Sequence, residues 1–231
     1  MWSSRFDAAA IAQRLAVAAR GKARRQELEH GQARPPQAAA VLLPLIRPYD
    51  DRPPPATPRQ DQEGELYAGG RRPGTPSWRL LFIRRAEHEH DRHSGEVAFP
   101  GGRTDPGEPD AVATALREAQ EEIGLDPNQV EILGQMPPFI TVSGFQVTPV
   151  IGIIPWPIAL KPDPTEVAEI FSLSLDWLRE PAHRHTRLWP APDHPQSREV
   201  IFYQEHEGRR LWGVTAWITL DFLRCLEPEP E

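Results

Sequence analysis

Cysteine is nearly absent from this chain of 231 residues, which holds one, Cys225. A single cysteine excludes an internal disulfide and any zinc site built on several thiolates. Because no evident base stands beside Cys225 in the sequence, we interpret it as a passive thiol rather than a nucleophile.

Long apolar runs are also missing. No stretch approaches the roughly 20 apolar residues that a membrane-spanning helix needs. Near the N-terminus, charged residues interrupt every candidate apolar core of a signal peptide. These residues are Arg5, Asp7, Arg14 and Arg20. We therefore expect a soluble, cytoplasmic protein with no membrane partner.

Positive charge is scarce. Lys and Arg number 26 against 33 Asp and Glu, which gives a formal net charge of −7. A broad nucleic-acid-binding surface needs clustered excess Lys and Arg, so we predict no nucleic-acid partner. An anionic substrate would have to be held by local cations or by metal ions.

Proline, by contrast, is abundant, with 27 residues. Residues 47–77 are rich in Pro, Arg, Gly and Asp. Such a stretch cannot bury enough apolar area to order itself. We therefore predict a Pro-rich loop or insertion there.

Residues 5–29 are typical of an amphipathic helix, with apolar residues set among Arg, Gln and Ala. The apolar residues are Phe6, Ile11, Leu15 and Val17. We interpret residues 1–37 as an N-terminal helical arm. It would pack either on the domain or on a partner subunit.

Residues 38–226 are predicted to form one domain of short strands and two longer helices, followed by an acidic tail over 227–231. Strand character marks 38–46, 78–84, 96–99, 130–133, 147–154 and 166–172, the last as a strand or short helix. Helical spacing marks 111–123 and 213–226, with a helical turn at 174–179 and a hairpin between 199–204 and 209–212. This order predicts an α+β or α/β layered domain, with helices packed on a mixed sheet.

The helix over 111–123 carries three carboxylates, because residues three and four apart share a helix face. Glu118, Glu121 and Glu122 therefore come close together, and like charges at this distance repel. A divalent cation would remove the conflict, and Mg²⁺ accepts carboxylate oxygens while keeping waters for a phosphate-bearing substrate. The alternative is a solvated acidic face. The Gly-Gly step before the helix and the immediate stop at Gly124 favour the metal site.

This segment resembles the Nudix hydrolase signature. The signature runs Gly, five residues, Glu, seven residues, Arg-Glu, apolar, any, Glu-Glu, any, Gly, apolar. Its fixed slots are filled by Gly102, Glu108, Arg117, Glu118, Glu121, Glu122, Gly124 and Leu125.

There is one departure from the signature, because eight residues separate Glu108 from Arg117 where the pattern has seven. We expect the extra residue at the junction of loop and helix, with Pro109 in the first helical turn. Either Glu108 or Asp110 could then reach Arg117.

The resemblance implies a metal-dependent hydrolase of a diphosphate linkage, with the α/β/α layered Nudix fold. It implies that Glu118 and Glu122 are the principal ligands of Mg²⁺ or Mn²⁺. Glu121 would support them, and Gly102 would offer its carbonyl. Arg117 would orient the glutamates, so that Glu121, Glu122 and Arg117 form the catalytic group.

The flanking segments resemble the coenzyme A pyrophosphatase branch of that family, over about residues 78–225. They are Arg85-Ala86, Ser94–Gly102, Val142–Gly152, Glu166–Phe171 and Trp212–Ala216. The step from Arg85 to Gly95 is about one residue longer than in the branch. This likeness implies cleavage of coenzyme A or its derivatives to 3′,5′-ADP and 4′-phosphopantetheine.

Four arginines are candidates for the 3′-phosphate or the diphosphate, because Arg suits bidentate phosphate contact. They are Arg84, Arg85, Arg92 and Arg103. The alternative for each is ordinary surface charge, which we favour for all but Arg85.

Two glutamates beyond the signature, Glu166 and Glu169, are candidates for a further metal ligand or a general base. The alternative for both is an ordinary surface position. The cluster of His88, His90 and His93 lies among charged residues in a predicted loop, so we do not assign a zinc site to it.

Two other functions stay open. One is hydrolysis of another nucleoside diphosphate derivative, such as ADP-ribose or a dinucleoside polyphosphate. Another is a module that binds a nucleotide or coenzyme A without turning it over. No Gly-x-Ser-x-Gly elbow or Walker loop is present, so a serine hydrolase or a nucleotide triphosphatase of those kinds has little support. The sequence leaves the oligomeric state open.

Overall fold

A mixed sheet forms the centre of the molecule. The structure is a computed structural model that describes residues 6–20, 35–48, 66–67, 77–88, 93–189 and 198–227. The eight-stranded sheet has the order β10-β3-β1-β8-β6, and three short strands pair with its inner strands: β4 with β3, β5 with β1 and β7 with β8. The strands are β1 (Gln37–Ile46), β3 (Arg79–Arg85), β4 (Val97–Ala98), β5 (Gly101–Arg103), β6 (Glu131–Gln135), β7 (Phe139–Ile140), β8 (Phe145–Ile154) and β10 (Val167–Ser174).

The central pair of strands, β1 and β8, runs parallel over ten residues, and their neighbours in this sheet run antiparallel. Each of the two is a long apolar run that is largely buried, as expected for strands covered on both faces. A separate small pair joins β2 (Leu66–Tyr67) to β9 (Ala159–Leu160).

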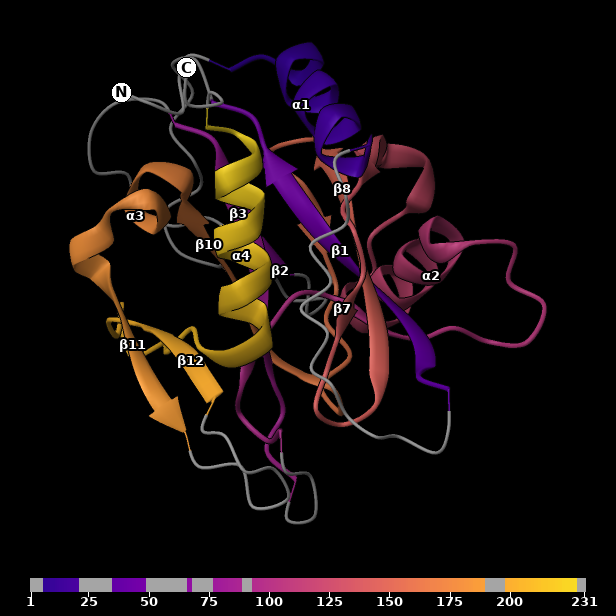
Figure 1. Cartoon of the computed structure of the whole chain (residues 1–231). Helices are drawn as coiled ribbons and strands as arrows, with labels where there is room; N and C mark the ends of the chain where they lie inside the picture. The colour runs from indigo at the N-terminus through magenta and orange to yellow at the C-terminus, as the bar shows by residue number, and fades with distance from the viewer. Residues whose placement is uncertain are drawn as a thin grey trace.

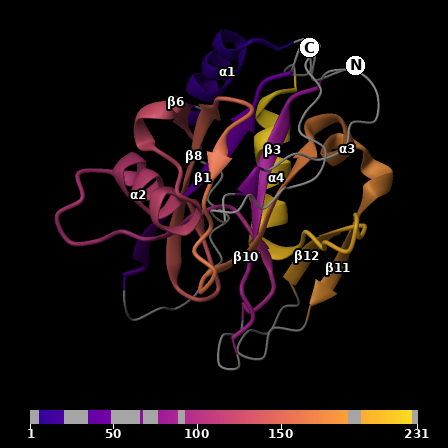
Figure 2. The ribbon, with the colours of Figure 1, turned by 180° about the vertical axis from the view of Figure 1, so that it is seen from behind.

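Helices cover both faces of the sheet (Figures 1 and 2). Helix α2 (Ala111–Ile123) packs on one face through Ala115, Ala119 and Ile123, which belong to one buried apolar cluster. On the other face, α1 (Ala8–Arg20) and α4 (Gly213–Cys225) pack into a second cluster, with the short α3 (Leu175–Arg179) beside α4. The predicted α+β fold in α/β/α layers is confirmed.

Helix α2 begins and ends at the predicted residues. Asp110 is its N-cap and accepts a hydrogen bond from the Ala113 N–H at 2.9 Å. Gly124 ends the helix in the left-handed conformation, at φ 66°. Pro109 therefore precedes the cap, so its predicted place in the first helical turn is wrong.

Helix α1 packs on the domain itself. Ile11 and Leu15 are fully buried in the core between the sheet and α4. The indole N–H of Trp78 donates to the Phe6 carbonyl at 2.9 Å, which ties the residues before α1 to the residue that precedes β3. Val17, predicted to share the apolar face, is 47% exposed, because it lies on the solvent side of the helix. Residues 21–29 of the predicted helix lie outside the described residues.

The predicted hairpin between 199–204 and 209–212 is only partly right. Strand β12 (Arg198–Tyr203) pairs along its length with β11 (Arg184–Trp189), a strand that the sequence did not indicate. Residues beyond β12 meet it only through single bridges, such as Phe202 with Trp212. The pattern missed β11 because most of that strand is exposed and carries no apolar alternation.

The ambiguous segment 166–172 is part of strand β10. Most of the predicted Pro-rich loop, residues 47–77, lies outside the described residues. Within the part of the chain that the structure describes, no helix has the length and apolar character to cross a membrane.

The packing of α1 predicts a loss of stability on truncation of its buried face. Leu15→Ala removes a fully buried side chain and should lower the free energy of unfolding by about 2–5 kcal/mol. Val17→Ala, on the exposed side of the same helix, should change it by no more than about 0.5 kcal/mol. Urea titrations followed by tryptophan fluorescence measure both. Equal midpoints for the two variants would contradict the packing of α1 on the core.

Candidate active site

A glycine pair on the short strand β5 lies against helix α2. Antiparallel pairing with β1 sets Gly101 opposite Val41 and Gly102 opposite Ala40. The Gly101 N–H donates to Glu122 Oε2 at 2.9 Å. A Cβ on Gly102 would lie 2.5 Å from Glu118 Oε1, so a side chain at this position would displace that carboxylate. The backbone of β5 therefore touches two of the three glutamates.

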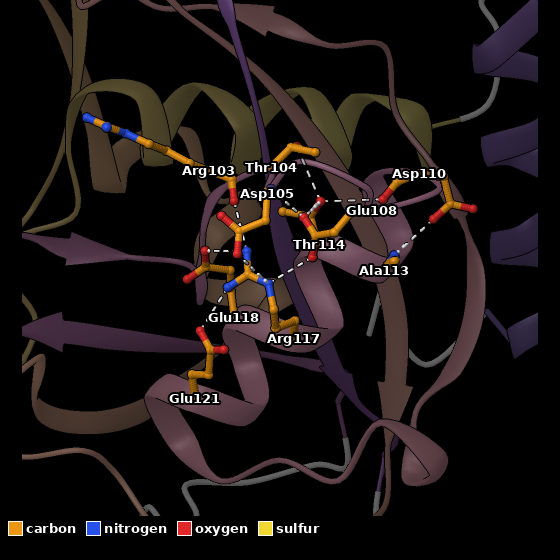
Figure 3. A network of polar contacts seen from close by, with 10 residues as sticks. All are labelled: Arg103, Thr104, Asp105, Glu108, Asp110, Ala113, Thr114, Arg117, Glu118 and Glu121. Atoms are coloured by element: carbon orange, nitrogen blue, oxygen red, sulfur yellow. Dashed lines mark hydrogen bonds and ion pairs between the residues drawn. The ribbon is translucent and has the colours of Figure 1, made fainter.

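Arg117 is the centre of the polar network around these glutamates (Figure 3). Its Nε donates to Glu108 Oε1 at 2.8 Å and its Nη1 to Glu121 Oε2 at 2.8 Å. Its Nη2 donates to Glu118 Oε1 and to the Arg103 carbonyl, both at 2.9 Å. The hydrogen bond to Glu108, followed by that to Glu118, raises the pKa of Arg117, so the guanidinium stays charged. One side chain thus holds three carboxylates and the loop before the helix.

Glu108 reaches Arg117 in spite of the extra residue between them, whereas Asp110 caps the helix. The other oxygen of Glu108, Oε2, accepts from the Thr114 hydroxyl and from the Asp105 N–H, each at 2.7 Å. The hydrogen bond from Arg117, followed by that from Thr114, lowers the pKa of Glu108 to about 2.

The three glutamates of α2 lie in three different environments. The side chain of Glu121 is 59% exposed, that of Glu118 is 16% exposed, and Glu122 is buried. Burial, together with the nearby charges of Glu118 and Glu166, raises the pKa of Glu122 to about 8, although the Gly101 N–H and Arg85 act in the opposite direction. Burial likewise raises the pKa of Glu118. Glu118 and Glu122 therefore lie together on the sheet side of α2, whereas Glu121 lies at its solvent-exposed edge.

Glu166 comes near these two carboxylates because its loop is anchored to the end of α2. The Asp163 N–H donates to the Glu122 carbonyl at 2.9 Å, and the Ala86 N–H donates to the Glu166 carbonyl at 2.8 Å. The Lys161 N–H binds the next carbonyl of the helix. Electrostatic repulsion from Glu166 acts on both Glu118 and Glu122.

Glu169 is differently placed. Arg84 Nε donates to its Oε2 at 3.3 Å, and Arg209 binds its Oε1. Burial tends to raise the pKa of Glu169, but the two arginines outweigh burial and lower it. Both oxygens are thus engaged in an arginine network that also includes Phe171, whose ring lies 4.7 Å from the Arg209 guanidinium carbon.

The sheet separates Arg84 from Arg85, because neighbouring residues on a strand point to opposite faces. Val167 opposite Arg85 belongs to the α2-side cluster, and the positive charge of Arg85 acts on Glu122. Arg84 pairs with Glu169 on the other face. Arg103 is exposed and lies over the Phe145 ring at 5.1 Å.

The histidine cluster does not converge within the described residues. His88 Nε2 lies 2.5 Å from the Thr165 carbonyl oxygen, whereas His93 Nδ1 contacts Glu96 at 2.9 Å. His90 and Arg92 lie outside the described residues.

The donor set around Glu122 suits a divalent cation. Carboxylate oxygens are the ligands that Mg²⁺ and Mn²⁺ prefer. Burial and the charges of neighbouring carboxylates make Glu118 and Glu122 costly to ionise, a cost that a cation would relieve, and the Gly102 backbone approaches Glu118 without a Cβ in between. In the residues described, no group of three His, Cys, Asp or Glu side chains already encloses a position for an ion. The carboxylates of Glu118, Glu122 and Glu166 therefore suit a divalent cation, which would bring their oxygens closer together on binding.

Three groups that bind the candidate glutamates were not identified from the sequence. The Gly101 N–H binds Glu122 and Arg209 binds Glu169, both through tertiary contacts that no local pattern indicates. Thr114 could have been noticed, because a polar residue one helical turn before Arg117 falls on the buried side of α2.

The contacts of Glu108 predict a stability that depends on acid. The hydrogen bonds from Arg117 and Thr114 lower the pKa of its carboxyl from 4.5 to about 2, so its contribution to the free energy of unfolding is present above pH 4.5 and is lost as the pH falls towards 2. Glu108→Gln should therefore unfold at lower urea concentration than the wild type at pH 7, with the two curves converging near pH 2. A constant difference across that range would contradict the ion pair. Glu131→Gln, at an exposed pair with Arg47, is the control.

Comparison with known proteins agrees with this geometry. Residues 71–194 match the family model of the NUDIX domain. The chain is 41% identical over 144 residues to "Uncharacterized Nudix hydrolase NudL" of Pectobacterium atrosepticum, covering 62% of this chain and 72% of the relative. It is 37% identical over 187 residues to the protein of the same name from Cronobacter sakazakii, covering 80% and 92%.

Among solved structures, a Nudix hydrolase from M. Smegmatis, RenU, aligns with a TM-score of 0.49 at 18% identity, over 88% of this chain and 95% of that one. Members of the Nudix family generally use divalent metal ions. From the domain match and the relatives of known family, together with the glutamates of α2, we conclude that this chain belongs to the Nudix family and is a hydrolase of diphosphate linkages in small molecules.

Proposed function

We propose that the substrate is coenzyme A or one of its derivatives, cut to 3′,5′-ADP and 4′-phosphopantetheine. The observation that carries the proposal is the position of Arg85. It belongs to the flanking segment that resembles the coenzyme A branch, and its charge acts on Glu122 of the signature helix. A guanidinium beside the carboxylates can meet a phosphate group of a substrate bound there.

We assign Glu118 and Glu122 as the principal ligands of Mg²⁺ or Mn²⁺, with Glu121 and the Gly102 carbonyl in support. When bound, the cation supplies positive charge against the phosphate oxygens and makes a water easier to deprotonate. Arg117 keeps Glu118 and Glu121 oriented through hydrogen bonds of 2.9 and 2.8 Å. The Gly101 N–H holds one oxygen of Glu122, which leaves the other oxygen for the cation.

Glu166 is the better supported of the two candidates for a general base. Its charge is felt by Glu118 and Glu122, whereas both oxygens of Glu169 are bound by arginines. In the proposed reaction a carboxylate oxygen of Glu166 takes a proton from water. The water oxygen bonds to one phosphorus, and the bond from that phosphorus to the bridging oxygen breaks. Both products then carry a terminal phosphate.

Arg85 and Arg103 are our candidates for the phosphate groups of the substrate. Both lie on segments that adjoin the carboxylates, since the Arg103 carbonyl accepts from Arg117. We assign no phosphate role to Arg84, because it is engaged with Glu169 on the opposite face of the sheet.

Two alternatives remain for the same site. The enzyme could cut another nucleoside diphosphate derivative, such as ADP-ribose or a dinucleoside polyphosphate, since the carboxylates act on the diphosphate and not on the rest of the molecule. A module that binds without turnover is the other. Magnesium-dependent product distinguishes it from an enzyme.

The proposed reaction predicts turnover that depends on Mg²⁺ and on Glu122. Wild-type protein with coenzyme A and Mg²⁺ should release 3′,5′-ADP, measured by chromatography, and Glu122→Gln should lower the rate at least about 100-fold. Glu131→Gln, a surface carboxylate paired with Arg47, should keep the wild-type rate. ADP-ribose and dinucleoside polyphosphates are run in parallel. Product from one of these alone would replace coenzyme A as the substrate, and no product from any would favour the binding module.

The proposed phosphate contact of Arg85 predicts a change in substrate preference. If Arg85 binds the 3′-phosphate, Arg85→Ala should lower kcat/KM on coenzyme A by about tenfold and leave dephospho-coenzyme A much less affected. Arg84→Ala is the matched control from the opposite face, and its ratio of the two efficiencies should equal that of the wild type. Equal ratios in the wild type and Arg85→Ala would remove the phosphate role of Arg85.

A further inference from the structure

Thr114 places a hydroxyl inside the protein, in contact with the network of Arg117. The residue is fully buried on α2, one helical turn before Arg117, and faces the loop between β5 and the helix. Its Oγ1 lies 2.7 Å from Glu108 Oε2, 3.2 Å from Thr104 Oγ1 and 3.4 Å from the Asp110 carbonyl. The arrangement is visible in Figure 3.

A threonine hydroxyl has a single proton to donate. Of the three acceptors, the Glu108 carboxylate is both the nearest and the charged one, and a hydrogen bond to a charged acceptor is the strongest. The proton of Thr114 therefore goes to Glu108 Oε2. With the Asp105 N–H on the same oxygen and Arg117 on the other, Glu108 is held at both ends of its carboxylate.

The orientation of Glu108 in turn determines the orientation of Arg117. Arg117 has other carboxylates within reach, since Asp105 lies 3.8 Å from its Nε and Glu118 and Glu121 bind its two terminal nitrogens. The Arg103 carbonyl binds one terminal nitrogen of the guanidinium, and Glu108 binds its Nε. Of the carboxylates around Arg117, Glu108 is the one whose other oxygen is itself held, by Thr114 and Asp105. Glu108 comes from a loop that is one residue longer than the family signature requires.

We propose that Thr114 is a positioning residue for the metal site: its hydroxyl fixes Glu108, which fixes Arg117, which holds Glu118 in the orientation that binds a divalent cation. The inference rests on the proposed role of Glu118 as a metal ligand. Thr114 does not touch the cation or the substrate. Loss of its hydroxyl should weaken cation binding.

The test measures Mn²⁺ binding directly, by electron paramagnetic resonance of the free ion, on the full chain without substrate. Thr114→Val keeps the shape of the side chain and removes the hydroxyl, and its dissociation constant for Mn²⁺ should rise about tenfold, as for other partners of metal ligands. Thr114→Ser keeps the hydroxyl and should bind within about twofold of the wild type. In a Glu108→Gln background, the loss caused by Thr114→Val should shrink, because the two residues act through one another.

A matched control separates this role from general packing. Thr219 is also fully buried on a helix, and its hydroxyl donates to the Thr215 carbonyl at 2.8 Å on α4, across the sheet from the site. Thr219→Val should bind Mn²⁺ as the wild type does. Thr114→Ala is the second variant should Thr114→Val fail to fold, and it should show the same weakened binding.

Wild-type affinity in folded Thr114→Val or Thr114→Ala would overturn the proposal, as would an equal loss in Thr114→Ser. A wild type that binds Mn²⁺ but cleaves no coenzyme A would reject the proposed substrate and leave the role of Thr114 intact. A wild type that binds no Mn²⁺ would reject both the metal ligands and the role of Thr114.

Discussion

The guanidinium of Arg117 is the interaction on which the site depends. It joins a loop, through Glu108 and the Arg103 carbonyl, to two carboxylates of the helix, Glu118 and Glu121. Without a cation between them, three glutamates on one helical segment repel one another. Four hydrogen bonds from one positively charged side chain offset part of that repulsion and set the directions in which the carboxylates point.

Arg117 donates its hydrogen bonds to groups other than Glu122, and the rest of the fold positions that glutamate. Glu122 is carried on the buried side of α2, where ionisation is costly, and its pKa of about 8 reflects that burial. The Gly101 N–H and the charge of Arg85 both favour its ionised form, and each comes from a strand rather than from the helix. The helix can approach the sheet this closely because its packing residues, Ala115 and Ala119, are small. The same close packing that forms the core thus creates a carboxylate that a cation would stabilise.

Local signals were sufficient for the helix that carries the chemistry. The apolar spacing, Asp110 before the helix and Gly124 after it define α2 at both ends, and the structure confirms its bounds. The local sequence pattern did not predict the structure where an element is exposed or where its partner is distant in the chain. Strand β11 has no apolar alternation to reveal it, and Val17 falls on the solvent side of α1 although it is apolar.

By itself, the sequence determined the family signature, the helix that carries it and the layered fold, because these follow from short spacings of glycine, arginine and apolar residues. Only the tertiary structure decided which carboxylates come together. Glu166 is near Glu122 because a loop binds the end of α2, and Glu169 is turned away because Arg84 and Arg209 hold it on the other face. Arg84 and Arg209 lie 85 and 40 positions from Glu169 in the chain, and no local pattern encodes a distance between them.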